Sequence, residues 1–355
     1  MQINIKNKFI NEDFESIYKT RSDWHEFINS SILITGAGGM LASYLVYYLI
    51  WLRIEKKVNL SILVNLRNEQ TCKELFGDFL SFDWFNFFVG NVCDDSILTL
   101  TPDFIIHAAS PASAKSFNNY PVETILPNII GTKNLLNMAK ENESKGMVFL
   151  SSTGVYGEGE KKQAFSENNP CRIDLSTNSN FYGISKYCGE ALCKAYASEY
   201  NVQVTSVRIA HSYGPTMDYI NDIRVFSDFV KCIVENRNIE IKSDGSSSRI
   251  FCYASDCISG ILIALLDGKS GESYNLGNPS QYYSMRELAE MLVSLFPELK
   301  LKVKYNEDAQ NQYKRISYRS DTTIDITKLK KLGWNPIISA RDGFFRTIQV
   351  IKGDN

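Results

Sequence analysis

The sequence has no long apolar run and almost no net charge, and each of these shortages excludes a class of protein. No stretch reaches the roughly 18 apolar residues that a membrane span needs, and the nearest one, residues 40–52, contains three tyrosines. The formal net charge is −2, so the composition gives no general attraction to nucleic acid or to anionic lipid. We therefore expect neither a nucleic-acid partner nor a membrane partner.

Cysteine and histidine occur without the spacings that metal sites or disulfide frameworks need. The eight cysteines contain no C-x-x-C pair, and the first residues carry no apolar signal core. We therefore expect reduced thiols in a cytoplasmic protein. No carboxylate accompanies the three histidines at ligand spacing; they are His25, His107 and His211. The sequence thus predicts no metal site.

What remains is an ordinary globular composition in which apolar runs alternate with helical patterns. The 355 residues are 44% hydrophobic and 22% charged, which suits about two folded domains. Strands that alternate with helices predict an α/β fold with a doubly wound parallel sheet. Strands are expected at 31–35, 60–66, 87–89, 104–107, 148–151 and 203–209, and helices at 41–52, 121–142 and 182–200.

Both ends of the chain differ from this regular middle part. Residues 1–29 are polar with a few apolar residues at helical spacing, and we expect an added helix before the first strand. Turn-rich pieces and short helices, such as 284–295, follow in the last third of the chain. The chain is therefore divided into an N-terminal extension (1–29), a sheet domain (30–212, with returns from the C-terminal half) and a smaller, irregular lobe (213–355).

A glycine-rich segment joins the first expected strand to the first long helix. Gly36, Gly39 and Ala42 give the spacing G-x-x-G-x-x-A. Glycine lets the backbone turn tightly and approach a pyrophosphate, and the free N–H groups of a helix N-terminus then bind that anion. Because it lies between a strand and a helix, the segment predicts a dinucleotide cofactor site.

The end of the second expected strand should read the ribose of that dinucleotide. No carboxylate stands at residues 63–68, but Asn65 or Asn68 could bond a ribose hydroxyl. Arg67 could stack on adenine or pair with a 2′-phosphate. Asn91, after the third strand, is placed to touch the adenine edge, or it is an ordinary loop residue. The sequence therefore favours NAD and leaves NADP open.

A serine, a tyrosine and a lysine follow in the order of a proton-transfer site. Ser152 ends the fifth expected strand, and Tyr182 and Lys186 share one face at the start of the next helix. An ammonium group near a phenol favours the phenolate, so we expect the pKa of Tyr182 to fall toward working pH. The serine hydroxyl can orient the oxygen of an alcohol substrate. Together these groups predict removal of an alcohol proton beside a hydride acceptor.

With these motifs in order, the sequence resembles the extended short-chain dehydrogenase/reductase family, and within it the branch that modifies nucleotide sugars. The resemblance covers residues 31–334 and includes the motifs TGAGGMLA, HAASPAS, SSTGVYG and YGISK. It implies a Rossmann domain with a small C-terminal lobe that binds the substrate, a nucleotide-diphosphate sugar. It also implies a homodimer through the helices at 121–142 and 182–200.

The resemblance also assigns roles to single residues. Ser152, Tyr182 and Lys186 resemble the catalytic triad, and Tyr182 and Lys186 also touch the cofactor. Further cofactor contacts would come from Gly36, Gly39, Met40, Leu41, Arg67, Asn91, Ala108, Ala109 and Ser110. Substrate contacts would come from Ser113, Thr153, His211, Arg224 and Arg249, with Arg249 on the diphosphate. Arg224 could equally be a solvated surface residue, and His211 could merely fill the site.

Two departures from the family pattern bear on the reaction. The 4,6-dehydratases carry Asp-Glu where Thr153 and Gly154 stand, and the UDP-glucuronate decarboxylases, to which the likeness is greatest locally, carry Glu in place of Gly154. Glycine cannot transfer a proton, so chemistry that needs only hydride transfer and one proton shuttle remains. We therefore favour a nucleotide-sugar 4-epimerase, with a 4-keto-sugar reductase or dehydrogenase as the alternative. A decarboxylase, a 4,6-dehydratase and a non-catalytic nucleotide-binding protein rank below these.

Overall fold

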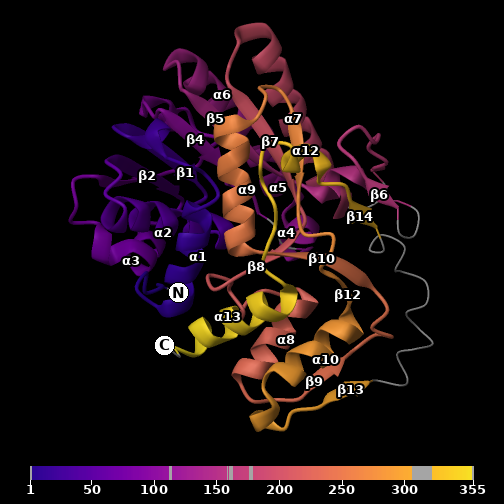
Figure 1. The fold of residues 1–355 in the computed structure, drawn as a ribbon. Helices are drawn as coiled ribbons and strands as arrows, with labels where there is room; N and C mark the ends of the chain where they lie inside the picture. Colours follow the sequence, from indigo (N-terminus) through magenta and orange to yellow (C-terminus); the bar gives the residue numbers. More distant parts are fainter. Residues whose placement is uncertain are drawn as a thin grey trace.

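A computed structural model describes residues 2–111, 114–157, 159, 163–175, 179–305 and 322–353. Seven parallel strands form its central sheet in the order β11-β7-β5-β4-β1-β2-β3 (Figure 1). Their bounds are β1 (Ser30–Thr35), β2 (Leu60–Leu66), β3 (Phe85–Val89), β4 (Phe104–His107), β5 (Gly146–Ser152), β7 (Val204–Ile209) and β11 (Ser273–Leu276). The predicted α/β class with a parallel sheet is confirmed, and each of the six predicted strands overlaps one of these.

Helices pack on both faces of the sheet, which explains why its central strands are almost entirely buried. Every residue of β4 is buried, a pattern typical of parallel sheets between two helical layers. α2 (Met40–Glu55) is also buried along most of its length, because α9 (Ala254–Asp267) and the N-terminal extension contact it as well as the sheet. The other helices of this part are α3 (Glu69–Phe76), α4 (Ala114–Asn119), α5 (Pro121–Leu126), α6 (Thr132–Glu141), α7 (Ser179–Tyr200) and α12 (Thr327–Lys330).

The helix predicted at 121–142 is interrupted. A π-helical turn at Pro127–Gly131 separates α5 from α6. Proline has no backbone N–H, so the regular helical hydrogen bond is missing at Pro127. The carbonyl oxygen of Pro127 lies 3.2 Å from Nε2 of His107 at the end of β4. The interruption thus faces the carboxyl edge of the sheet, where the candidate site lies.

The C-terminal part of the chain adds a smaller lobe with an apolar core of its own. Phe226, Phe251 and Phe344 are among its buried residues. The lobe lies at the bottom of Figure 1, and its described residues form a three-stranded and a two-stranded sheet with three helices. These elements are β8 (His211–Tyr213), α8 (Val225–Val234), β9 (Ile239–Ile241), β10 (Ser248–Tyr253), β12 (Tyr282–Ser284), α10 (Met285–Leu295), β13 (Val303–Tyr305) and α13 (Ala340–Lys352), with a further pair β6 (Ala164–Phe165) and β14 (Thr323–Ile324) beside the site.

The N-terminal extension contains the expected added helix, α1 (Lys8–Tyr18). Its buried Asp13 accepts hydrogen bonds of 2.6 Å from the hydroxyls of Tyr44 and Tyr253. Arg346 of α13 donates to the same carboxylate at 3.1 Å. The two ends of the chain therefore lie close together, as Figure 1 shows. The extension fixes α2, the lobe and the C-terminal helix to one another.

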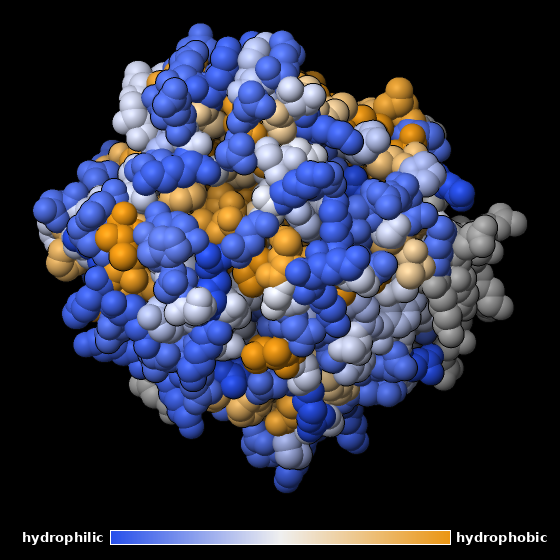
Figure 2. Space-filling view, turned by 45° about the horizontal axis from the view of Figure 1, so that its top comes forward, coloured by the Kyte–Doolittle hydropathy of each residue, from blue (hydrophilic) through white to orange (hydrophobic). Residues whose placement is uncertain are grey.

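The surface and the thiols agree with the composition. Hydrophilic side chains cover most of the face shown in Figure 2, and hydrophobic ones form small, separate groups. Within the ranges that the structure describes, no helix combines the length and apolar character that a membrane crossing requires. All eight cysteines are free thiols, as expected.

Candidate active site

The glycine loop after β1 is shaped by its close approach to the end of β4. Gly36 has a φ of +63°, and a Cβ atom there would lie 2.6 Å from Cα of Ala109. Only glycine fits such a position without strain. Gly39 is the N-cap of α2, and no side chain caps this helix. The N–H groups of its first turn are therefore left for an anionic ligand.

A buried histidine holds this loop against β4. Nδ1 of His107 lies 2.8 Å from Oγ1 of Thr35, which also accepts a 3.3 Å hydrogen bond from the N–H of Ala109. Burial lowers the pKa of His107 to about 3, so the ring is neutral at pH 7. In this arrangement Thr35 donates to Nδ1, and Nε2–H donates to the carbonyl of Pro127. His107 thus positions the loop and is no proton donor for a substrate.

A cavity of about 410 Å³ runs from this loop past the ends of β2 and β3. Its glycine cradle and uncapped helix N-terminus fit the pyrophosphate of a dinucleotide. Seven of the residues expected to bind the cofactor line this cavity, namely Gly36, Gly39, Arg67, Asn91, Ala108, Ala109 and Ser110. The structure therefore brings together residues that lie up to 74 positions apart in the sequence.

The two asparagines at the end of β2 have other partners than a ribose. Nδ2 of the buried Asn65 donates to the carbonyls of Phe88 and Gly90 at 3.3 and 3.0 Å. Oδ1 of Asn68 accepts from the N–H of Gln70 at 2.8 Å and so caps α3. Asn65 therefore ties β2 to the end of β3, and Asn68 begins a helix. Both donors of the Asn65 amide are thus used within the protein, whereas the bond given for Asn68 uses only its Oδ1.

A second cavity, of about 480 Å³, holds the three residues of the expected triad. Ser152 comes from the end of β5, and Tyr182 and Lys186 come from the first turns of α7. This cavity shares Gly39, Ala108 and Ser110 with the first one. Met40 and Leu41, expected to bind the cofactor, line it too. A dinucleotide on the glycine loop would thus reach the triad with its second half.

The three triad side chains are held in place by contacts of different kinds. The hydroxyls of Ser152 and Tyr182 are hydrogen-bonded. Nζ of Lys186 donates to the carbonyl of Leu150 at 2.6 Å and lies 5.8 Å from the centre of the Tyr182 ring. Phe117 stacks on that ring with a centroid distance of 4.5 Å. Sequence reasoning missed Phe117, because no spacing links α4 to α7.

The prediction that Lys186 lowers the pKa of Tyr182 is wrong. The pKa of Tyr182 is raised above its usual value, because burial disfavours the phenolate more than the bond from Ser152 and the charge of Arg224 favour it. Burial also lowers the pKa of Lys186 to about 7. Spacing on a helix shows that two groups share a face, but their depth decides the balance between desolvation and charge.

The expected substrate residues surround the other side of Tyr182. Thr153 and His211 line both the triad cavity and a third one of about 330 Å³, which Arg249 also lines, whereas Arg224 lines the triad cavity alone. Ser113 lies outside the described residues. Asn180, at the start of α7, lines the third cavity and was not predicted.

The charges at this end of the site are cationic. Nε of Arg224 donates to Asp222 at 2.7 Å, and a guanidinium nitrogen of Arg249 donates to the Ser247 hydroxyl at 2.7 Å. Burial and these two arginines lower the pKa of His211 to about 3. His211 is therefore a neutral group between two cations, which suits a polar contact to an anionic substrate.

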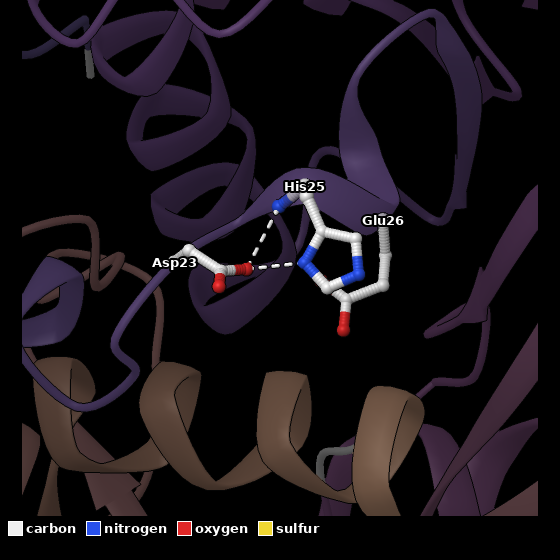
Figure 3. A group of neighbouring side chains, drawn as sticks. All are labelled: Asp23, His25 and Glu26. Carbon is white, nitrogen blue, oxygen red and sulfur yellow. Dashed lines mark hydrogen bonds and ion pairs between the residues drawn. The ribbon is translucent and has the colours of Figure 1, made fainter.

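His25 differs from the sequence expectation that no carboxylate accompanies a histidine. Its Nδ1 contacts Asp23 and lies 3.5 Å from Oε2 of Glu26 (Figure 3). The ligand atoms of the three residues lie within 4.8 Å of one another. The His25 and Asp23 side chains are 69% and 59% exposed, however, and such solvated ion pairs are common without a metal ion.

Comparisons with known proteins agree with this geometry. The family model described as "NAD dependent epimerase/dehydratase family" matches residues 32–277. UDP-glucuronic acid decarboxylase 3 of Arabidopsis thaliana is 29% identical over 321 residues, which are 89% of this chain and 87% of that protein. The crystal structure of UDP-glucuronic acid 4-epimerase from Bacillus cereus, in complex with UDP-glucuronic acid and NAD, is 25% identical, with a TM-score of 0.74 over 91% of this chain and 99% of that one.

A further solved structure shows how completely the fold is shared. An epimerase from Methanothermobacter thermautotrophicus superposes with a TM-score of 0.78 over 96% of both chains at 22% identity. The matched range runs from β1 to the end of β11, so it contains the glycine loop, Ser152, Tyr182 and Lys186. The protein is therefore an enzyme with NAD as its cofactor, and the chain belongs to the NAD-dependent epimerase/dehydratase family.

Proposed function

We propose that this enzyme is a 4-epimerase of nucleotide-diphosphate sugars. One observation carries the proposal. The two cavities around Tyr182 are lined, among the residues that the structure describes, by no aspartate and no glutamate. Tyr182 is therefore the group placed to move a proton, and Gly154 offers no second acid or base. Epimerisation at C4 needs one proton shuttle only.

The chemistry follows from the residues around Tyr182. Tyr182 takes the proton of the sugar 4-hydroxyl, while Ser152 holds the same oxygen by a hydrogen bond. NAD, when bound, would supply the hydride acceptor and donor for C4. The sugar would have to turn while C4 is a carbonyl, so that C4 regains its hydrogen on the other face. Tyr182 then gives its proton back to the oxygen, so no net oxidation occurs and no co-reactant is consumed.

Lys186 lies beside Tyr182, with its Nζ 5.8 Å from the centre of the phenol ring. Its pKa of about 7 leaves the ammonium form partly populated at neutral pH, but its charge does not offset the burial that raises the pKa of Tyr182. We therefore assign Lys186 to holding the cofactor beside the phenol. Arg224 is the cation whose charge favours the phenolate of Tyr182.

The nucleotide part of the substrate would lie in the C-terminal lobe. Arg249 lines the cavity there, and a planar guanidinium pairs well with a diphosphate. Arg224, from the loop before α8, would assist from the triad cavity. This arrangement supports the division into a sheet domain that binds the cofactor and a lobe, residues 213–355, that binds the sugar nucleotide.

The curated relatives named as decarboxylases favour a second candidate reaction. Their names indicate removal of a carboxylate from UDP-glucuronic acid. Gly154 argues against decarboxylation by this enzyme, because the decarboxylases carry Glu at this position. A Cβ atom at Gly154 would lie 3.3 Å from Oγ of Ser152 and 3.8 Å from the Tyr182 ring. A longer side chain at residue 154 would thus stand beside the reacting groups, and glycine leaves that place without an acid or base.

We also propose that the enzyme is a homodimer. Two neighbouring helical elements expose apolar side chains that a monomer would leave in water. The exposed side chains are Tyr120, Val122, Leu126 and Ile130 from the α5 region and Tyr187 from α7. A cytoplasmic location is supported by the eight free thiols, because oxidising compartments favour disulfides.

The test uses the purified enzyme with a panel of UDP- and dTDP-sugars, including UDP-glucuronic acid. Absorbance and mass spectrometry report whether NAD stays bound, and chromatography follows the sugars without added cofactor. An epimerase converts a sugar nucleotide into its C4 epimer and retains its NAD. Consumption of NADPH with a 4-keto sugar would instead identify a reductase, and release of CO₂ from UDP-glucuronic acid would identify a decarboxylase. Either result would refute the proposal.

A further inference from the structure

Phe117, from the short helix α4, lies directly against the phenol of Tyr182. The two rings stack with a centroid distance of 4.5 Å and an angle of 19° between their planes. Phe117 is half-buried and lines the triad cavity. Stacked aromatic rings hold each other in one relative orientation and gain more than the burial of their surface alone. An aromatic side chain without any polar atom thus forms one wall beside the proton-transfer group.

The other contacts of Tyr182 involve its main chain, one side of its ring and its hydroxyl. The start of α7 packs closely on the turn after β5, since a Cβ atom at Gly183 would lie 2.5 Å from the carbonyl oxygen of Gly154. A Cβ atom at Gly154 would in turn lie 3.8 and 3.9 Å from Cδ1 and Cε1 of Tyr182. The hydroxyl is hydrogen-bonded to Ser152. Gly154 therefore meets the Cδ1–Cε1 side of the ring, whereas Phe117 covers a face of it.

The charged and titratable groups around this phenol come from several elements. Arg224, before α8, lines the triad cavity, and its charge favours the phenolate. Lys186 of α7, with a pKa of about 7, is partly protonated at neutral pH, and His211 of β8, with a pKa of about 3, is neutral. Arg249 of β10 lines the third cavity, and Glu123 of α5 lines the cofactor cavity. Among the described residues that line the two cavities around the phenol there is no carboxylate. Burial is thus the main force against the phenolate.

We propose that Phe117 is a positioning residue for Tyr182, whose ring it holds toward the substrate and shields from the water of the triad cavity. Without the aromatic ring, the phenol could turn about its side-chain bonds, and water could reach it from a cavity of about 480 Å³. Water stabilises a phenolate better than a hydrocarbon ring does, so the pKa of Tyr182 would fall. The inference rests on Tyr182 as the proton-transfer group and holds whichever sugar-nucleotide reaction the enzyme catalyses.

The test compares wild type, Phe117→Ala and Phe117→Tyr as purified enzymes with NAD bound. The limb of the kcat/KM profile that rises with pH reports the ionisation of the general base. Phe117→Ala should lower kcat/KM by about 2- to 10-fold, the effect of losing one aromatic pair, and should move this limb to lower pH. Phe117→Tyr keeps a stacked ring and should restore both. Absorbance titration of ionised tyrosine, with the same protein carrying Tyr182→Phe subtracted, gives the midpoint without turnover.

A second stacked pair provides the matched control. Phe82 stacks on Trp84 at 4.9 Å and 22°, before the edge strand β3, and Phe82→Ala should change neither the rate nor the midpoint. If Phe117→Ala does not fold or retain NAD, Phe117→Leu takes its place. Leucine keeps most of the apolar volume without the flat ring, so kcat/KM should still fall, with little movement of the midpoint.

The outcomes separate this inference from the proposed function. A wild-type kcat/KM and midpoint in Phe117→Ala, or a wild-type kcat/KM in Phe117→Leu, would overturn the positioning role. Tyr182→Phe would then still be inactive, and the proposed function would stand. Full turnover by Tyr182→Phe would refute the proposed function and this inference together.

Discussion

Glu190 lies at the centre of a buried polar network that joins α7 to the strands behind the site. Its carboxylate accepts hydrogen bonds from Nε of Arg208 at 3.0 Å, from a terminal nitrogen of Arg208 at 2.7 Å and from Ser273 at 3.0 Å, and a further one from Ser151. The side chains of Arg208 and Glu190 are 6% and 5% exposed. The network thus fixes Ser151, next to Ser152, to the helix that carries Lys186.

Replacing Glu190 by glutamine removes the charge and keeps the shape. Arg208 would then be a buried cation without its counter-ion, and breaking a buried pair from one side costs about 3–5 kcal/mol. The pair Glu272–Lys328 provides the matched control. Its Nζ and Oε2 atoms also lie 2.6 Å apart, but its side chains are 38% and 31% exposed. A pair this exposed contributes about 0–1 kcal/mol.

Urea unfolding followed by tryptophan fluorescence gives the free energy of unfolding for both variants and for the wild type. We expect Glu190→Gln to lose about 3 kcal/mol or more and Glu272→Gln to lose less than about 1 kcal/mol. If Glu190→Gln were no more destabilising than Glu272→Gln, the buried ion pair would not be what fastens α7 to β5 and β7.

Three shorter predictions concern other groups. Burial raises the pKa of Asp13 to about 7; the folded chain therefore keeps this proton where the unfolded chain releases it, so the free energy of unfolding should fall between pH 4 and 7 by up to about 1.4 kcal/mol per pH unit. Asp13→Asn should flatten this slope in urea titrations at several pH values. Gly36→Ala should prevent retention of NAD, seen in the absorbance spectrum, because its Cβ would meet Cα of Ala109 at 2.6 Å. Lys186→Met should fold with unchanged or higher stability, because a buried cation is removed, and yet lose turnover.

Much of the sheet could be predicted because parallel strands leave a strong local signal. The run at 60–66 has the same bounds as β2, and the glycine loop follows β1 as expected. β11 (Ser273–Leu276) gave no such signal, since a four-residue strand with a polar residue in its middle does not look like a core strand. Its Asn275 is buried because Tyr156 donates to it and its own amide donates to Phe165 and Asp325. These partners are distant in the sequence.

In the site, the sequence predicted which residues meet but not how their pKa values change. Motif spacing places Tyr182, Lys186 and Ser152 together, and the structure agrees. The sign of the change in the pKa of Tyr182 was wrong, because it depends on how deeply the phenol lies and on Arg224, which comes from another part of the chain. The hydrogen bonds to Asp13 could not be predicted from the sequence for a similar reason, since its partners lie on α2, β10 and α13.

The proposed reaction requires Tyr182 as the proton-transfer group beside NAD. Its most direct test is the rate of turnover, with the sugar nucleotide that the wild-type enzyme converts fastest, for the wild type, Tyr182→Phe and the control Tyr200→Phe, which changes a tyrosine of the same helix that is 42% exposed. We predict a loss of about 100-fold or more for Tyr182→Phe, as is typical when a general base is removed, with NAD still bound, and wild-type turnover for Tyr200→Phe. Equal rates for Tyr182→Phe and the wild type would contradict the account.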